Sequence, residues 1–177
     1  MPLGGVLVAL SLALGGCTTL QPPHFAGTQP LLEPDRFFTG HTCSWGVFED
    51  RAGANPRRPF TTECFGRRER GELILAQTFT YGDGTVQHRV WRIRRLDLHH
   101  YEAVANDVVG VGRGEAYGNA FHWEYTVALK PGNPLFRVKL KQWMYLQKDL
   151  RTLLNRGTVS VFGVTVAQVT EEFRRQP

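Results

Sequence analysis

The chain has 177 residues, of which 42% are hydrophobic and 21% charged, and its formal net charge is +5. These values are typical of one globular domain and exclude both a disordered chain and a bundle of membrane-spanning helices. Most of the basic residues are arginines, which suit bidentate contact with the phosphates of anionic lipid head groups. Nucleic acid is not an expected partner, because no recognition-helix or RNA-binding motif is present.

The N-terminal segment is typical of a lipoprotein signal peptide. An apolar run over residues 3–14 is followed by two glycines and Cys17, an arrangement that resembles the bacterial lipobox. A transmembrane helix would need about 20 apolar residues, more than this run provides. We therefore expect a signal peptide over residues 1–16 and lipidation of Cys17. Because Thr18 rather than an aspartate follows, we expect the protein at the periplasmic face of the outer membrane.

Residues 17–36 contain four prolines and no periodic apolar pattern, which predicts an extended tether before a domain over residues 37–174. The domain opens with a predicted hairpin, whose strands at 37–49 and 60–65 flank turn residues 50–56. This pairing would place Cys43 opposite Cys64. If the compartment is oxidising, this pairing predicts a Cys43–Cys64 disulfide. The alternative is two buried free thiols.

A second hairpin is predicted over residues 73–81 and 86–94, because Asp83-Gly84 between them is typical of a two-residue type I′ turn. That turn places Ala76 opposite Trp91 and Ile74 opposite Ile93, on the face expected to point inward.

The remaining segments are also predicted to be strands. Residues 115–129 alternate strictly between larger and smaller side chains, whereas the glycines at 110, 112 and 114 predict a corner or bulge. Further strands are expected at 101–109, 136–146, 150–154 and 164–173, with a turn at 155–157. Eight to nine strands with short turns, and no long amphipathic helix, predict an all-β antiparallel barrel or sandwich.

Several short motifs carry a family resemblance over most of the predicted domain. They are Phe38-Thr39-Gly40, residues 46–51, 81–84 and 89–93, Asp107-Val108, Gly118-Asn119-Ala120, Trp143-Met144 and Phe162-Gly163. The chain resembles the uncharacterised bacterial lipoproteins known as domain of unknown function 3833. Phe-x-Gly followed by Trp45 is also similar to the lipocalin opening, which implies a lipocalin-like (calycin-type) barrel.

A lipocalin-sized barrel is either filled by its own side chains or holds one small ligand. The sequence leaves both alternatives open for its aromatic stripe. If the interior is hollow, the candidate ligand-binding residues are Arg89, Trp91, Tyr101, Asn119, Phe121, Trp123 and Tyr125.

No metal, cofactor or catalytic residue is predicted. Adjacent His99 and His100 would point to opposite faces of a strand, and no histidine or cysteine spacing matches a known zinc site. The glycine run at 110–114 is not followed by a helix, which excludes a nucleotide-binding loop.

Counting hairpin ends places the turns near residues 67–71 and 96–100 at the end of the barrel where the tether enters. That end would carry a membrane-facing basic cluster of Arg67, Arg68, Arg70, Arg94 and Arg95.

The functional hypothesis is a lipid-anchored, non-enzymatic barrel that binds or carries an apolar or lipid-like ligand. The alternatives are a structural or assembly lipoprotein that acts through protein contacts and, third, an enzyme.

Overall fold

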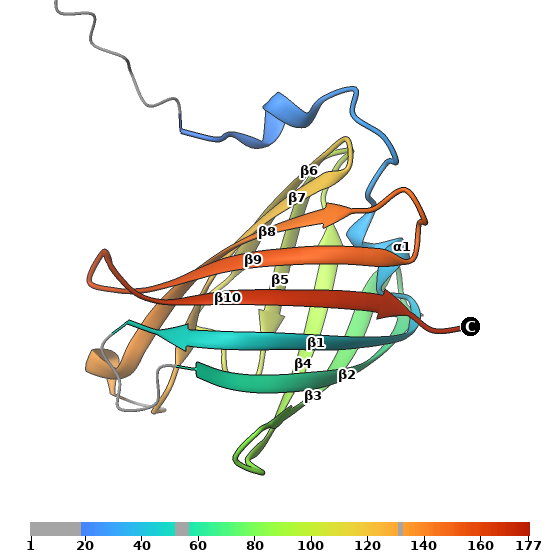
Figure 1. Cartoon of the computed structure of the whole chain (residues 1–177). Coiled ribbons are helices and arrows are strands. Elements are labelled where there is room, and N and C mark those ends of the chain that lie inside the picture. The colour runs from blue at the N-terminus through green and yellow to red at the C-terminus, as the bar shows by residue number, and fades with distance from the viewer. Residues whose placement is uncertain (1–18, 52–56, 131–132) are drawn as a thin grey trace, which may run out of the picture.

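The computed structural model describes residues 19–51, 57–130 and 133–177, and the predicted signal peptide and Cys17 lie outside them. The chain forms a closed antiparallel barrel in which each strand pairs with its neighbours in sequence and β1 closes on β10 (Figure 1). No helix within these ranges is long and apolar enough to cross a membrane. The strands are β1 (Gly40–Asp50), β2 (Arg57–Glu69), β3 (Glu72–Tyr81), β4 (Val86–Arg95), β5 (His100–Ala105), β6 (Gly112–Tyr117), β7 (Ala120–Ala128), β8 (Arg137–Leu146), β9 (Thr152–Val161) and β10 (Val164–Arg175).

The all-β barrel fold is confirmed, with ten strands in place of eight to nine. The additional strand arises within the alternating segment 115–129, which is two strands, β6 and β7. Tyr117 pairs with Ala120, so Gly118 and Asn119 form a turn in which Gly118 has a φ of +52°. Large side chains occupy odd positions on both sides of this turn, so the sequence pattern shows no break, although odd positions face outward in β6 and inward in β7.

The predicted hairpin between β3 and β4 exists, but its register differs by one residue. Leu75, not Ala76, lies opposite Trp91, so Leu75 and Trp91 share the inward face. The cause is a three-residue loop in which Gly84 has a φ of +81°, closed by a hydrogen bond from the Tyr81 N–H to the Thr85 carbonyl. A two-residue type I′ turn would have had one residue fewer.

The predicted Cys43–Cys64 disulfide is wrong, because both residues are free thiols. The β1–β2 register places Thr42 opposite Cys64 and Glu63 opposite Cys43. Since successive side chains point to opposite faces of a strand, Cys64 is buried inside the barrel, whereas Cys43 lies on its outer surface.

The predicted turn at residues 155–157 is also absent. Strand β9 continues through these residues, and the chain turns instead at Phe162 and Gly163, both with positive φ. Asn155 is buried here because it points into the barrel, not because it belongs to a loop.

Residues 19–36, expected to form an extended tether, pack along the barrel. They include η1 (Pro22–Phe25) and α1 (Pro34–Phe37), and the Leu32 N–H donates to the Gly118 carbonyl. Helix α1 lies across one end of the barrel (Figure 1), where Phe38 packs edge-on against Phe173 of β10. The N-terminal segment therefore closes this end of the barrel.

Candidate functional site

The barrel encloses a cavity of about 410 Å³. Pro34 and Phe38 line it at the end closed by α1, whereas Leu129 and Val161 line it at the opposite end. Its wall is mostly apolar, with polar side chains at a few positions, as is usual for cavities that bind small apolar molecules. The interior of the barrel is therefore hollow rather than filled.

Five of the seven predicted ligand-binding residues line this cavity: Arg89, Trp91, Phe121, Trp123 and Tyr125. The other two, Tyr101 and Asn119, are not part of its lining. Tyr101 is buried near the closed end, and its hydroxyl donates to Asp35 across 3.4 Å. Asn119 belongs to the β6–β7 turn, where its side chain meets Thr28 of the N-terminal segment.

The aromatic side of the cavity is built from β4 and β7. The ring of Trp91 packs edge-on against Tyr125 at 5.0 Å between centroids, and Trp123 lies 5.7 Å from Trp91. Behind them, β6 contributes glycine where other strands carry side chains. A Cβ atom at Gly114 would lie 2.3 Å from the Trp123 ring and 2.4 Å from that of Phe121. The glycines predicted to form a corner thus make room for the rings of β7.

Arg89 supplies a buried cation to the cavity wall. Its Nε donates to Asp107 across 2.8 Å and its Nη2 donates to the other carboxylate oxygen across 2.7 Å. Gln87 also donates to Asp107, which helps to fix the carboxylate in place. The carboxylate in turn contacts one edge of the guanidinium. The hydrogen bond from Arg89 Nη1 to the hydroxyl of Tyr125 is long, at 3.4 Å. The guanidinium is therefore fixed in place while part of its hydrogen-bonding capacity stays unused.

Two polar residues that the sequence analysis missed complete the middle of the wall. Gln77 accepts the indole N–H of Trp91 across 2.8 Å, which satisfies the one polar atom of that ring. Gln142 is also buried and lines the cavity from β8. Both occupy inward positions of strands whose other inward residues are apolar, and this position in the alternation could have identified them.

Glu171 of β10 is the most unusual residue of the site, because it is a buried carboxyl in an apolar wall. Ser44 donates to it across 2.6 Å and the Asn155 amide donates to it across 3.0 Å. Burial raises the pKa of Glu171 to about 7, although these two hydrogen bonds act to lower it. The sequence signal was its position between Val169 and Phe173, two inward apolar residues of one strand.

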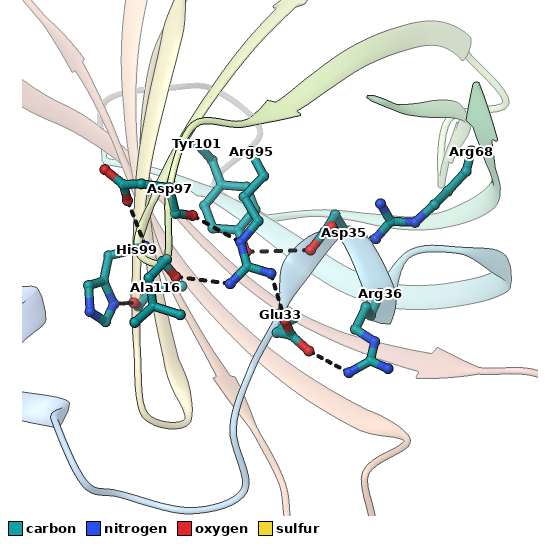
Figure 2. Close-up of polar contacts among 10 residues, drawn as sticks. Glu33, Asp35, Arg36, Arg68, Arg95, Asp97, His99, Tyr101 and Ala116 are labelled. Atoms are coloured by element: carbon teal, nitrogen blue, oxygen red, sulfur yellow. Dashed lines mark hydrogen bonds and ion pairs between the residues drawn. The ribbon is translucent and has the colours of Figure 1, made fainter. Parts of the chain in front are cut away.

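Two residues of the predicted basic cluster, Arg68 and Arg95, lie beside α1 at the closed end (Figure 2). Arg95 donates to Glu33 across 2.6 Å and Arg68 pairs with Asp35, so two arginines bind the N-terminal segment itself. Hydrogen bonds from Arg36 and then from Arg95 lower the pKa of Glu33. Arg67 and Arg94 pair with Glu69 and Glu102, respectively. Much of the cluster's charge is thus matched by nearby carboxylates.

Comparisons with known proteins agree with this fold. The model of the family described as "Protein of unknown function (DUF3833)" matches residues 11–175. No curated protein matches the chain in sequence. Two solved structures share the fold, each with a TM-score of 0.58 and each covering 82% of this chain. One is the S-type phycobiliprotein lyase CPES from Guillardia theta, which is 6% identical in sequence and is matched over 94% of its own length. The other is Rv2717c from M. tuberculosis, which is 13% identical and is matched over 99% of its own length.

Proposed function

The chain belongs to the DUF3833 family of proteins of unknown function, and from that premise we propose that it is a lipid-anchored barrel that binds or carries an apolar or lipid-like ligand. The observation that carries this proposal is the cavity of about 410 Å³, which lies within the range of small-molecule sites. Its lining supports a ligand with a large apolar body.

The polar side chains of the wall suggest how such a ligand would be oriented. Arg89 is held by Asp107 and is suited to an anionic or hydrogen-bond-accepting group. Glu171 lies on β10, and its neutral form could donate a hydrogen bond. A ligand with a polar group at one position and an apolar remainder fits both features.

Native mass spectrometry of the protein purified from its own membrane tests this proposal. A co-purified lipid or small apolar molecule supports the carrier. A bound protein, with no small molecule, supports the alternative of an assembly lipoprotein.

A displacement assay with a fluorescent fatty acid sharpens the test. Val159→Trp places a large ring on the cavity wall and should weaken binding at least tenfold, because Val159 faces the cavity from β9. Leu154→Trp is the matched control, since Leu154 lies on the outer face of the same strand. Equal binding by both variants, or no binding by the unmodified protein, would contradict a ligand-binding cavity.

Catalysis is the second candidate function. It is favoured by Glu171, since a buried carboxyl in a cavity with a pKa of about 7 is the kind of group that can transfer a proton near neutral pH. One of the structures that share the fold is also that of a phycobiliprotein lyase. Turnover of a co-purified ligand that Glu171→Gln abolishes, without loss of binding, would favour this candidate over a carrier.

The anchoring part of the proposal rests on the sequence around Cys17. Acylation there would place the protein on the outer membrane, and the arginine cluster at the closed end could then contact lipid phosphates. Cys17→Ser should move the protein from the membrane fraction to the soluble fraction. Cys43→Ser, which changes a thiol on the barrel surface, should leave the fractionation unchanged.

A further inference from the structure

Three side chains of types that can bind a metal meet on the outer surface of the barrel, across the wall from the cavity. His41 and Cys43 are alternate residues of β1 and so share its outer face. Glu63 of β2 lies directly opposite Cys43 in the strand register. These residues therefore form a compact group that two paired strands hold in place.

The distances among their ligand atoms match a metal site. The Cys43 sulfur lies 3.4 Å from the His41 Nε2 and 3.3 Å from a Glu63 carboxylate oxygen. Tetrahedral zinc with its usual bond lengths would separate a sulfur from a nitrogen or oxygen ligand by about 3.6 Å. The His41 Nε2 and the Glu63 oxygen are hydrogen-bonded at 2.5 Å and would move apart by roughly 0.9 Å to admit the ion.

The neighbouring aromatic ring orients the histidine. Phe65, the cross-strand partner of His41, stacks on the imidazole with centroids 4.5 Å apart and planes inclined by 6°. This contact fixes the plane of the imidazole, whose Nε2 faces Cys43 and Glu63. The Glu63 side chain is 53% exposed, so solvent reaches the group and water can supply a fourth ligand.

We propose that His41, Cys43 and Glu63 bind a zinc-class divalent ion through Nε2, Sγ and a carboxylate oxygen, with water as the fourth ligand. Nitrogen, sulfur and oxygen ligands together favour zinc over calcium or magnesium, which prefer oxygen alone. The thiol would bind as a thiolate, with its proton released to solvent. The bound ion would cross-link β1 to β2.

Titration of the full-length protein with Co²⁺ tests the site, because a cobalt–thiolate bond gives a charge-transfer absorption band. We expect the band to saturate at one equivalent and to disappear when Zn²⁺ is added. Affinity for cobalt should fall at least tenfold in His41→Ala and in Glu63→Gln, both of which keep every cysteine.

His100→Ala is the matched control. His100 is another exposed histidine paired with a carboxylate, that of Asp97, but among the described residues it belongs to no group of three potential ligands. This variant should bind cobalt as the unmodified protein does.

Alkylation mapped by mass spectrometry provides a second measurement that does not depend on the variants. Zn²⁺ should slow the modification of Cys43 at least tenfold. Absence of the cobalt band, a band of equal affinity in His41→Ala, or alkylation of Cys43 at an unchanged rate with Zn²⁺ present would each overturn the proposal.

Discussion

Ser44 donates its hydroxyl to Glu171 across 2.6 Å, although 127 positions separate these residues in the chain. They lie on β1 and β10, the strands whose pairing closes the barrel. Closure of the sheet thus brings a carboxyl into the apolar wall together with a hydrogen-bond donor for it. The energetic cost of ionising this carboxyl inside the wall has measurable consequences for stability.

The first prediction concerns pH. Because the pKa of Glu171 is raised from 4.5 to about 7, the folded protein retains a proton that the unfolded chain releases at lower pH. The stability due to this proton is complete below pH 4.5 and is lost as pH rises through 7. We expect this group alone to lower the free energy of unfolding by on the order of 3 kcal/mol over that interval.

Urea unfolding at several pH values, compared between the protein and Glu171→Gln, measures this effect. The variant lacks the ionisable group, so its stability should fall less between pH 4.5 and 8. Glu172→Gln is the control, because Glu172 lies on the outer side of the same strand and pairs there with Arg174. Parallel pH profiles for the protein and Glu171→Gln would show that Glu171 ionises normally.

The second prediction concerns the buried ion pair. Arg89→Ala leaves Asp107 without its cation, and we expect a loss of about 3 kcal/mol in the free energy of unfolding. Arg92→Ala on the same strand removes an exposed arginine paired with Glu72 and should cost less than about 1 kcal/mol. Chemical denaturation of both variants measures these changes. Equal losses in the free energy of unfolding would contradict the larger contribution expected from the buried Arg89–Asp107 pair.

The third prediction concerns packing behind the aromatic wall. Gly114→Ala forces a methyl group against the rings of Phe121 and Trp123, and we expect a destabilisation of about 1–3 kcal/mol. Gly157→Ala should cost less, because there the nearest atom is 3.2 Å away on the flexible side chain of Gln142. A thermal melt of Gly114→Ala that matches that of the unmodified protein would argue against this close packing.

The fourth prediction concerns the two thiols of the barrel. Cys64 is buried, and burial raises the pKa of its thiol to about 12, so it should resist iodoacetamide until the protein unfolds. Cys43 lies on the surface and should react in the native protein at a rate limited by its own raised pKa, caused first by partial burial and then by Glu63. Peptide mapping distinguishes them, and equal labelling of both in the native state would contradict this arrangement.

Alternation along single strands was sufficient to predict the barrel and part of its lining. Trp91, Phe121, Trp123 and Tyr125 were recognised because their neighbours in sequence are polar or small, and this local pattern determines which face is buried. The same pattern could not determine how strands are paired. Register depends on the number of residues in each turn, and one additional residue in the Gly82–Gly84 loop shifted every pair of β3 and β4.

The incorrect disulfide has a related origin. A pairing shifted by one residue exchanges inward and outward positions on one of the two strands. The predicted register placed Cys43 and Cys64 on the same face of the sheet, whereas the observed register places them on opposite faces. Glu171 was missed for a different reason, since its partner Ser44 comes from a distant part of the chain and Asn155 was predicted to lie in a turn. Ser44 becomes a neighbour of Glu171 only through the β1–β10 pairing that closes the barrel, a contact that no local pattern in the sequence indicates.

The inward positions of β6 are occupied by Gly112, Gly114 and Ala116, and these small residues make the barrel asymmetric. Strands β5 and β6 contribute no side chain to the cavity lining that the structure describes, because the rings of β7 rest against them. The lining side chains therefore come from the other strands, and those of β8, β9 and β10 are mainly branched aliphatics such as Val138, Val159 and Val169. Rings also enter the lining from other strands, among them Phe60 of β2 and Phe79 of β3, so a guest molecule would meet aromatic surfaces along several strands and methyl groups along β8, β9 and β10.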